Sequence, residues 1–166
     1  MEAREQGFVD VEISANGLGT ITFGHPMSNS LPGDILRKLA ATITELGQND
    51  SVRVILLKSE GERAFCAGAS FDELIASDKE QSGQAFFNGF AQVINAMRDC
   101  PKFIIARVQG KAVGGGVGLA AAADYALASE YASVKLSELS IGIGPFVIAP
   151  AISRKIGVKN LRHPGP

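Results

Sequence analysis

The sequence predicts an α/β fold with parallel strands, because β-branched apolar segments alternate with segments of helical period. Residues 52–58 (VRVILLK) and 103–108 (FIIARV) are almost continuously apolar, as expected of strands covered on both faces. Residues 33–47 and 84–98 instead repeat their apolar side chains at helical spacing. No linker, low-complexity tract or repeat interrupts this pattern, so we expect a single domain over residues 1–166.

Turn residues predict the remaining elements. Residues 8–13 and 19–23 are short alternating segments, and Asn16-Gly17 between them supplies the backbone angles of a tight turn, which predicts a hairpin. The other expected elements are a loop at 25–32, Pro32 in the first turn of the helix at 33–47, Gly47 at the end of that helix, a short helix at 117–123 and a strand at 125–129.

Composition and charge exclude several classes of partner. The net charge of -1 favours neither nucleic acid nor an anionic membrane surface. The longest runs of apolar or small residues, 112–123 and 141–152, are shorter than the about 20 residues that a membrane span needs. The N-terminal residues lack the apolar core of a secretory signal, and Cys66 and Cys100 form neither a metal-binding spacing nor a disulfide framework. We therefore expect a cytoplasmic protein with no metal, no nucleic-acid partner and no membrane partner.

Two glycine-containing loops are the candidate functional features. The triplet Gly114-Gly115-Gly116 precedes a helix, where unpaired N–H groups and the positive end of the helix dipole can meet a ligand oxygen. The loop at 64–74 (AFCAGASFDEL) also joins a strand region to a short helix. An oxyanion hole needs two N–H donors on one oxygen, and each loop can supply one. The triplet could also serve tight strand-to-helix packing alone, and its spacing matches neither nucleotide-binding glycine motif.

The segments AFCAGASFDEL and QGKAVGGGVGLAAAAD resemble the two signatures of the enoyl-CoA hydratase/isomerase (crotonase) family, in the family's order. The resemblance runs from the N-terminal hairpin to about residue 158, and it implies a crotonase-like (ClpP/crotonase) spiral of β-β-α units. It also implies that Ala69 and Gly115 supply the two oxyanion donors through their backbone N–H groups. No separate cofactor is implied, because coenzyme A is part of the acyl-CoA substrate.

The resemblance extends to residues that would contact the substrate. The stretch flanking the pantetheine matches this sequence at 67–72, and the loop at 26–30 (PMSNS) resembles the family's CoA-adenine loop, with Pro26 where a basic residue is common. The expected substrate-binding residues are Pro26, Met27, Ser28, Ala67, Ala69, Ser70, Phe71, Asp72 and Gly115.

The acidic residues are expected to decide the reaction. Family hydratases use two glutamates: the first falls three residues after the second oxyanion donor, at Gly118 here, and the second falls fourteen residues after Asp124, at Glu138. Glu138 is therefore the predicted acid/base, while an ordinary surface glutamate is the alternative. Asp124 is expected to be structural.

One remaining carboxylate leaves three functions open. The segment around Glu138, with GGGVGL, looks most like hydratases of branched substrates such as methylglutaconyl-CoA, so we favour hydration of a short or branched enoyl-CoA by a family lyase. A double-bond isomerase also needs only one base. A catalytically silent acyl-CoA-binding or scaffold fragment is the third alternative.

The end of the sequence bears on assembly. Family members continue with a helical C-terminal region that covers the acyl pocket and helps to build trimers, whereas this sequence ends in RKIGVKNLRHPGP. We expect that C-terminal helical region to be largely missing here. The resemblance implies a homotrimer or a dimer of trimers for a full-length protein.

Overall fold

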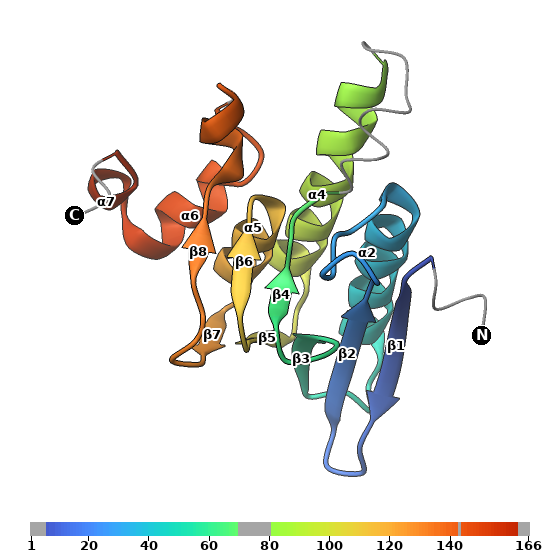
Figure 1. Ribbon diagram of the computed structural model, residues 1–166. Helices are drawn as coiled ribbons and strands as arrows, with labels where there is room; N and C mark the ends of the chain where they lie inside the picture. The colour runs from blue at the N-terminus through green and yellow to red at the C-terminus, as the bar shows by residue number, and fades with distance from the viewer. Residues whose placement is uncertain (1–5, 70–80, 143, 163–166) are drawn as a thin grey trace.

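The computed structural model describes residues 6–69, 81–142 and 144–162, and it places two sheets beside a layer of helices (Figure 1). The elements are β1 Phe8–Ile13, β2 Leu18–Gly24, α2 Gly33–Gln48, β3 Val54–Ser59, β4 Ala64–Cys66, α4 Gln81–Asp99, β5 Phe103–Val108, β6 Lys111–Val113, α5 Gly115–Ala122, β7 Tyr125–Ala128, β8 Val134–Lys135, the 3-10 helix η1 Ser137–Ile141, α6 Ala149–Ile156 and α7 Val158–Arg162.

The larger sheet has the strand order β1-β2-β3-β5-β7, and the smaller one has the order β4-β6-β8. Among the described strands, β1 and β2 alone pair antiparallel, and they form the predicted hairpin with Gly17 at a φ of +87° in its turn. All other pairs are parallel. A strand of the larger sheet is followed by a short strand of the smaller sheet and then by a helix, as in β5, β6 and α5. This repetition confirms the predicted spiral of β-β-α units.

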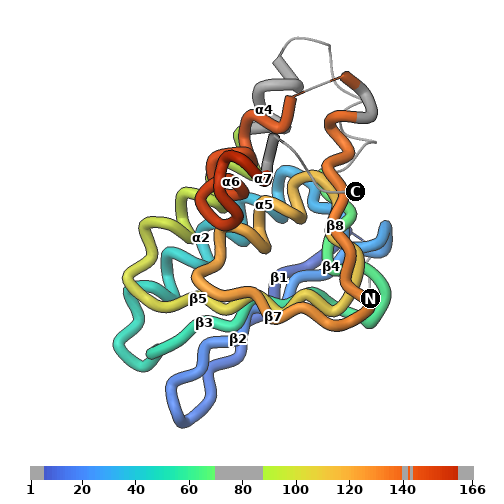
Figure 2. Tube along the Cα trace, turned by 90° about the vertical axis from the view of Figure 1, so that its left-hand side faces the viewer, coloured from blue at the N-terminus to red at the C-terminus, as the bar shows by residue number. Residues whose placement is uncertain are grey.

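The strands β3 and β5 were predicted to be covered on both faces of the sheet, and this prediction was wrong for one face. Along β3 the side chains alternate between buried, such as Ile55 and Leu57, and half-buried, such as Leu56. Phe103 and Arg107 on β5 are exposed. Figure 2 shows the reason: the helices of the described chain all lie on one face of the larger sheet. Apolar residues on the open face gave these strands the appearance of fully buried ones.

Gly47 has a different role from the predicted one. The helix α2 continues past it to Gln48, and Asn49 caps the end. Gly47 is buried, and a Cβ built on it would lie 3.1 Å from the Cys100 Sγ atom. A glycine is therefore needed at this position for close packing of α2 against the segment that follows α4, rather than for a left-handed turn.

Candidate active site

The smaller sheet brings the predicted site segments together. Strand β4 leads into residues 67–69, β6 leads into the glycine triplet, and β8 leads into the segment that contains Glu138. The three strands lie side by side and parallel, so their carboxyl ends meet at one edge of the sheet (Figure 1). Gly68 thereby lies near Gly115, and Gly114 lies near Glu138.

The loop after β4 lies directly against the start of α5. Gly68 has a φ of +92°, and a Cβ built on it would lie 3.0 Å from the Val113 carbonyl oxygen and 3.8 Å from the Gly115 nitrogen. On Gly116, a Cβ would lie 2.6 Å from the Cys66 carbonyl oxygen. Side chains at these positions would push the two loops apart, which explains why glycines occupy them.

The two predicted donor groups lie in the loop after β4 and at the start of α5. Gly115 is the first residue of α5, so its N–H has no intrahelical acceptor. Leu31 forms an isolated parallel bridge with Ala69, in which the Leu31 N–H donates to the Gly68 carbonyl at 2.9 Å. Within residues 6–69, 81–142 and 144–162, neither the Ala69 N–H nor the Gly115 N–H has a hydrogen-bond acceptor.

Glu138 lies beside the same helix start. Gly114 has a φ of +52°, and a Cβ built on it would lie 2.9 Å from the Ser137 Oγ atom and 3.2 Å from the Glu138 Oε1 atom. The absence of a side chain on Gly114 leaves the space that the carboxyl group uses. The Glu138 Oε2 atom is buried and has no hydrogen-bond partner in the described part of the chain. A buried carboxylate oxygen without a donor is costly, which favours a role toward a ligand over a surface role.

Gly118, where the family resemblance places the first of the two glutamates, is enclosed by apolar side chains. Gly118 is buried within α5, and a Cβ built on it would lie 2.4 Å from Ile148 Cγ2 and 3.3 Å from Ile94 Cδ1. A larger side chain at position 118 would therefore overlap with Ile148. Sequence reasoning identified Gly118 but missed Ile148, which is 30 residues away and lies just before α6.

The loop with Pro26, Met27 and Ser28 lies next to the loop after β4. All three residues are exposed, and the Ser28 carbonyl accepts a hydrogen bond from the Ala67 N–H at 3.2 Å. The buried Asn29 holds the loop in place: its Nδ2 donates to the Glu60 carbonyl at 2.8 Å and to the Ala64 carbonyl at 2.9 Å. Sequence reasoning missed this positioning role of Asn29, although asparagine in a loop between turn residues is a usable signal.

Comparison with known proteins identifies the family. The family model described as enoyl-CoA hydratase/isomerase matches residues 13–163. The chain belongs to this family. It is 34% identical over 131 residues to a putative enoyl-CoA hydratase/isomerase, YngF, of Bacillus subtilis, a match that covers 77% of this chain and 49% of that protein. It is also 34% identical over 117 residues to the mitochondrial methylglutaconyl-CoA hydratase of Rattus norvegicus, a match that covers 70% of this chain and 37% of that protein.

Solved structures agree with this family membership. An enoyl-CoA hydratase from Bacillus anthracis superposes with a TM-score of 0.86 at 29% identity, covering 93% of this chain and 60% of that one. A putative enoyl-CoA hydratase/isomerase (crotonase) from Legionella pneumophila gives a TM-score of 0.85 at 31% identity, with 93% and 60% covered. The chain thus has the crotonase fold, and it spans about half the length of the curated relatives it matches first.

Three predicted substrate-binding residues, Ser70, Phe71 and Asp72, lie outside the described residues. Asp124 has the predicted structural role, since its Oδ2 accepts a hydrogen bond from the Ile104 N–H at 2.8 Å. The far end of α5 is held by Lys155, whose Nζ donates to the Ala123 carbonyl at 2.6 Å and to the Asp124 carbonyl at 2.9 Å. These contacts anchor the C-terminal end of the helix that begins at Gly115.

Cys66 is part of the packing of the site. Its thiol is fully buried, and this burial raises its pKa to about 12, although the Gly68 N–H donates a hydrogen bond to its sulfur. A neutral thiol is a poor nucleophile, so Cys66 serves as a small apolar filler under the loop. In the described residues, no group of three or more His, Cys, Asp or Glu side chains could hold a metal ion, and no helix is long and apolar enough to cross a membrane.

Proposed function

We propose that this chain binds an acyl-CoA and hydrates a short or branched enoyl-CoA. The thioester oxygen would accept hydrogen bonds from the Ala69 and Gly115 N–H groups. One observation carries the proposal: three groups meet at the start of α5. The Gly115 N–H has no acceptor among the described residues, the loop with Gly68 lies against it, and the Glu138 carboxyl group lies beside the preceding residue, Gly114.

The chemistry follows from where charge develops during the reaction. Addition at Cβ of a conjugated thioester moves negative charge onto the carbonyl oxygen, and two backbone donors with a helix dipole behind one of them stabilise that charge. Glu138 would take a proton from the attacking water as the new C–O bond forms. The resulting acid would then give a proton to Cα of the enolate. One carboxylate can perform both transfers, so the reaction balances without a second acid.

The surrounding residues fit an acyl-CoA. Pro26, Met27 and Ser28 form an exposed loop beside Ala67, where the CoA portion would lie. Ser70, Phe71 and Asp72, which lie outside the described residues, remain predicted to bind the substrate because of the sequence resemblance. Ile94 and Ile148 beside Gly118 offer an apolar surface for a short or branched acyl chain. Coenzyme A would arrive with the substrate, so no further cofactor is required.

The closed position at Gly118 favours a second candidate, double-bond isomerisation. Moving a proton between Cα and Cγ needs one base, and the Glu138 carboxyl group lies beside Gly114 at this helix start. Incubation with 2-enoyl-CoA and 3-enoyl-CoA thioesters distinguishes the two reactions. Loss of the conjugated absorbance with formation of a 3-hydroxy product supports hydration, whereas conversion of the 3-enoyl into the 2-enoyl thioester supports isomerisation.

The Glu138→Gln variant tests the role of the carboxylate. We expect kcat/KM to fall by about 10²–10⁴-fold, the range for one general acid/base, with little change in the Kd for a saturated acyl-CoA. Glu130→Gln is the matched control, because Glu130 is an exposed glutamate after β7, and it should keep full activity. Equal turnover by wild type and Glu138→Gln would exclude this assignment. Acyl-CoA binding without turnover of either substrate would instead support a silent binding fragment.

A further inference from the structure

The hydroxyl group of Ser137 lies beside the Glu138 carboxyl group at the start of α5. A Cβ built on Gly114 would lie 2.9 Å from the Ser137 Oγ atom and 3.2 Å from the Glu138 Oε1 atom. Both oxygen atoms are therefore within hydrogen-bonding distance of one point, and the glycine leaves that point empty. The next residue is Gly115, whose N–H is the predicted oxyanion donor. A molecule as small as water, placed beside Gly114, would reach both side chains.

A capping role does not account for the Ser137 hydroxyl group. Serine is common at the start of a helix because its side chain can bond to unpaired N–H groups. Ser137 is the first residue of η1, yet Leu136 occupies the cap position and makes no side-chain cap hydrogen bond. Among the described residues, the Ser137 Oγ atom has no hydrogen-bond partner. What this hydroxyl group does face is the space at Gly114.

The attacking water of a hydration reaction needs more than one contact. A water molecule held by one carboxylate alone can rotate about that hydrogen bond, whereas a second contact directs its lone pair toward the carbon that it attacks. The side chains beside Gly118, Ile94 and Ile148, cannot provide the second contact because they are apolar. The polar atom that lies next to Glu138 at Gly114 is the Ser137 Oγ atom.

We propose that Ser137 is a second catalytic residue, one that holds the attacking water between its Oγ atom and the Glu138 carboxylate; this inference rests on the proposed function. The water donates one hydrogen bond to Ser137 Oγ and the other to Glu138. Its oxygen forms the new bond to Cβ, the electron pair of the Cα–Cβ double bond moves toward the thioester oxygen, and the proton shared with Glu138 passes to that carboxylate. Glu138 then returns a proton to Cα. Ser137 neither gains nor loses a proton.

This role makes Ser137 specific to the step that uses water. Removal of a proton from Cα needs a base and the oxyanion donors, and Glu138 with the Ala69 and Gly115 N–H groups supplies them. No water attacks in that step. Loss of the Ser137 hydroxyl group should therefore impair hydration while leaving proton transfer at Cα intact, whereas loss of the Glu138 carboxylate should impair both.

The Ser137→Ala variant tests this role with 2-butenoyl-CoA as the probe. We expect kcat for hydration to fall by about 10²-fold, the cost of misplacing a reactant. The Kd of butanoyl-CoA should change little, because the oxyanion donors are untouched. Exchange of the Cα hydrogens of butanoyl-CoA in D₂O should continue at the wild-type rate, and Glu138→Gln should abolish it. Ser137→Thr keeps a hydroxyl group and should retain most of the hydration.

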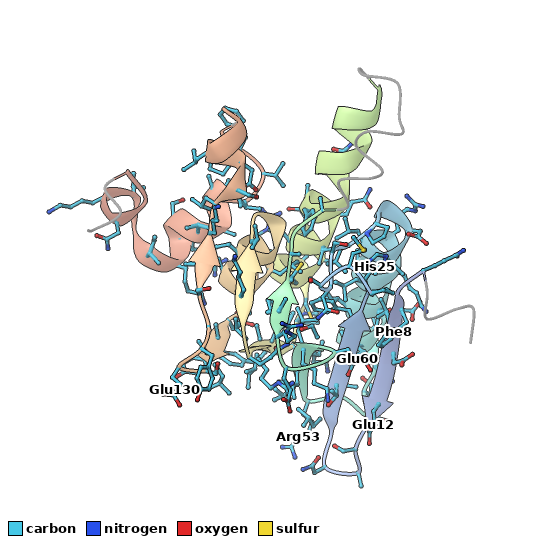
Figure 3. All side chains as sticks on the ribbon, viewed as in Figure 1. Phe8, Glu12, His25, Arg53, Glu60 and Glu130 are labelled. Atoms are coloured by element: carbon cyan, nitrogen blue, oxygen red, sulfur yellow. The ribbon has the colours of Figure 1, made fainter. Side chains whose placement is uncertain are left out.

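Ser133→Ala is the matched control for loss of a serine hydroxyl group. Ser133 is exposed and lies just before β8. Figure 3 shows Glu130, which precedes it in the chain, at the lower end of the sheets, and β8 runs upward from there toward η1 (Figure 1). This variant should hydrate 2-butenoyl-CoA like wild type. Circular dichroism verifies that each variant is folded.

The possible outcomes separate the role of Ser137 from the proposed function. Equal hydration by wild type and Ser137→Ala overturns the role of Ser137 and leaves the proposed function standing. Equal loss of hydration and of Cα exchange in Ser137→Ala also overturns it, because the whole site rather than the water would then be affected. A wild type that hydrates no 2-enoyl-CoA overturns the proposed function itself, and the role of Ser137 with it.

Discussion

Ile148 packs against Gly118 so closely that the two positions should be strongly coupled. A Cβ on Gly118 would lie 2.4 Å from Ile148 Cγ2 and 2.9 Å from Ile148 Cβ. Ile148 itself is 2% exposed. The Gly118→Ala substitution therefore adds a methyl group where none fits. The same substitution made together with Ile148→Ala loses the closest overlap, that with Cγ2, while the Cβ atom of residue 148 at 2.9 Å and Ile94 Cδ1 at 3.3 Å remain.

The expected free energies of unfolding follow from these contacts. Alanine in place of a glycine within a helix gains about 0.5–1 kcal/mol, while overpacking costs about 1–3 kcal/mol, so Gly118→Ala alone should destabilise the protein. Ile148→Ala alone should cost about 2–5 kcal/mol, because it leaves a cavity. In the Ile148→Ala background, Gly118→Ala should cost less than in the wild type, because the overlap with Cγ2 is gone. The coupling between the two sites is then about 1–2 kcal/mol.

Urea unfolding of the four proteins, followed by circular dichroism, measures this coupling. The reasoning requires that the effect of Gly118→Ala depends on residue 148. If Gly118→Ala lowers the free energy of unfolding equally in both backgrounds, Ile148 does not restrict the space at residue 118. An acidic side chain could then be accommodated at residue 118. The single-carboxylate mechanism would then lose its structural support.

Two further predictions concern Asn29 and Cys66. Asn29→Ala removes the donor to the Glu60 and Ala64 carbonyls and should lower the free energy of unfolding by about 2–3 kcal/mol, measured by urea titration. The control Asn88→Ala changes an exposed asparagine and should alter the free energy of unfolding little. Equal effects of the two substitutions would contradict the positioning role of Asn29. The pKa of Cys66 is raised from 9.0 to about 12 in the folded state. The unfolded thiol therefore loses its proton first, and stability relative to Cys66→Ala should fall as pH rises from about 9 toward 12; a difference that is constant with pH would refute this.

Local patterns in the sequence were sufficient for the hairpin and for the main helices and strands. Asn16-Gly17 supplies a turn that does not depend on the rest of the chain, and helical spacing reports burial of one face of α2. Strands β6 and β8 have three and two residues, so they show no periodicity that could reveal them. They are held by pairing with distant segments. Yet these short strands align the loops of the candidate site.

The sequence by itself determined the family, the order of the two glycine loops and the identity of Glu138 as the acid to examine. Glycine identity and residue spacing are written along the chain, and they carry this information without coordinates. Only the tertiary structure decided that Gly68 lies near Gly115, that Glu138 lies beside Gly114, and that Ile148 packs against Gly118. It also decided that the helices of the described residues all lie on one face of the larger sheet. These properties depend on contacts between residues far apart in the chain, which local sequence patterns do not encode.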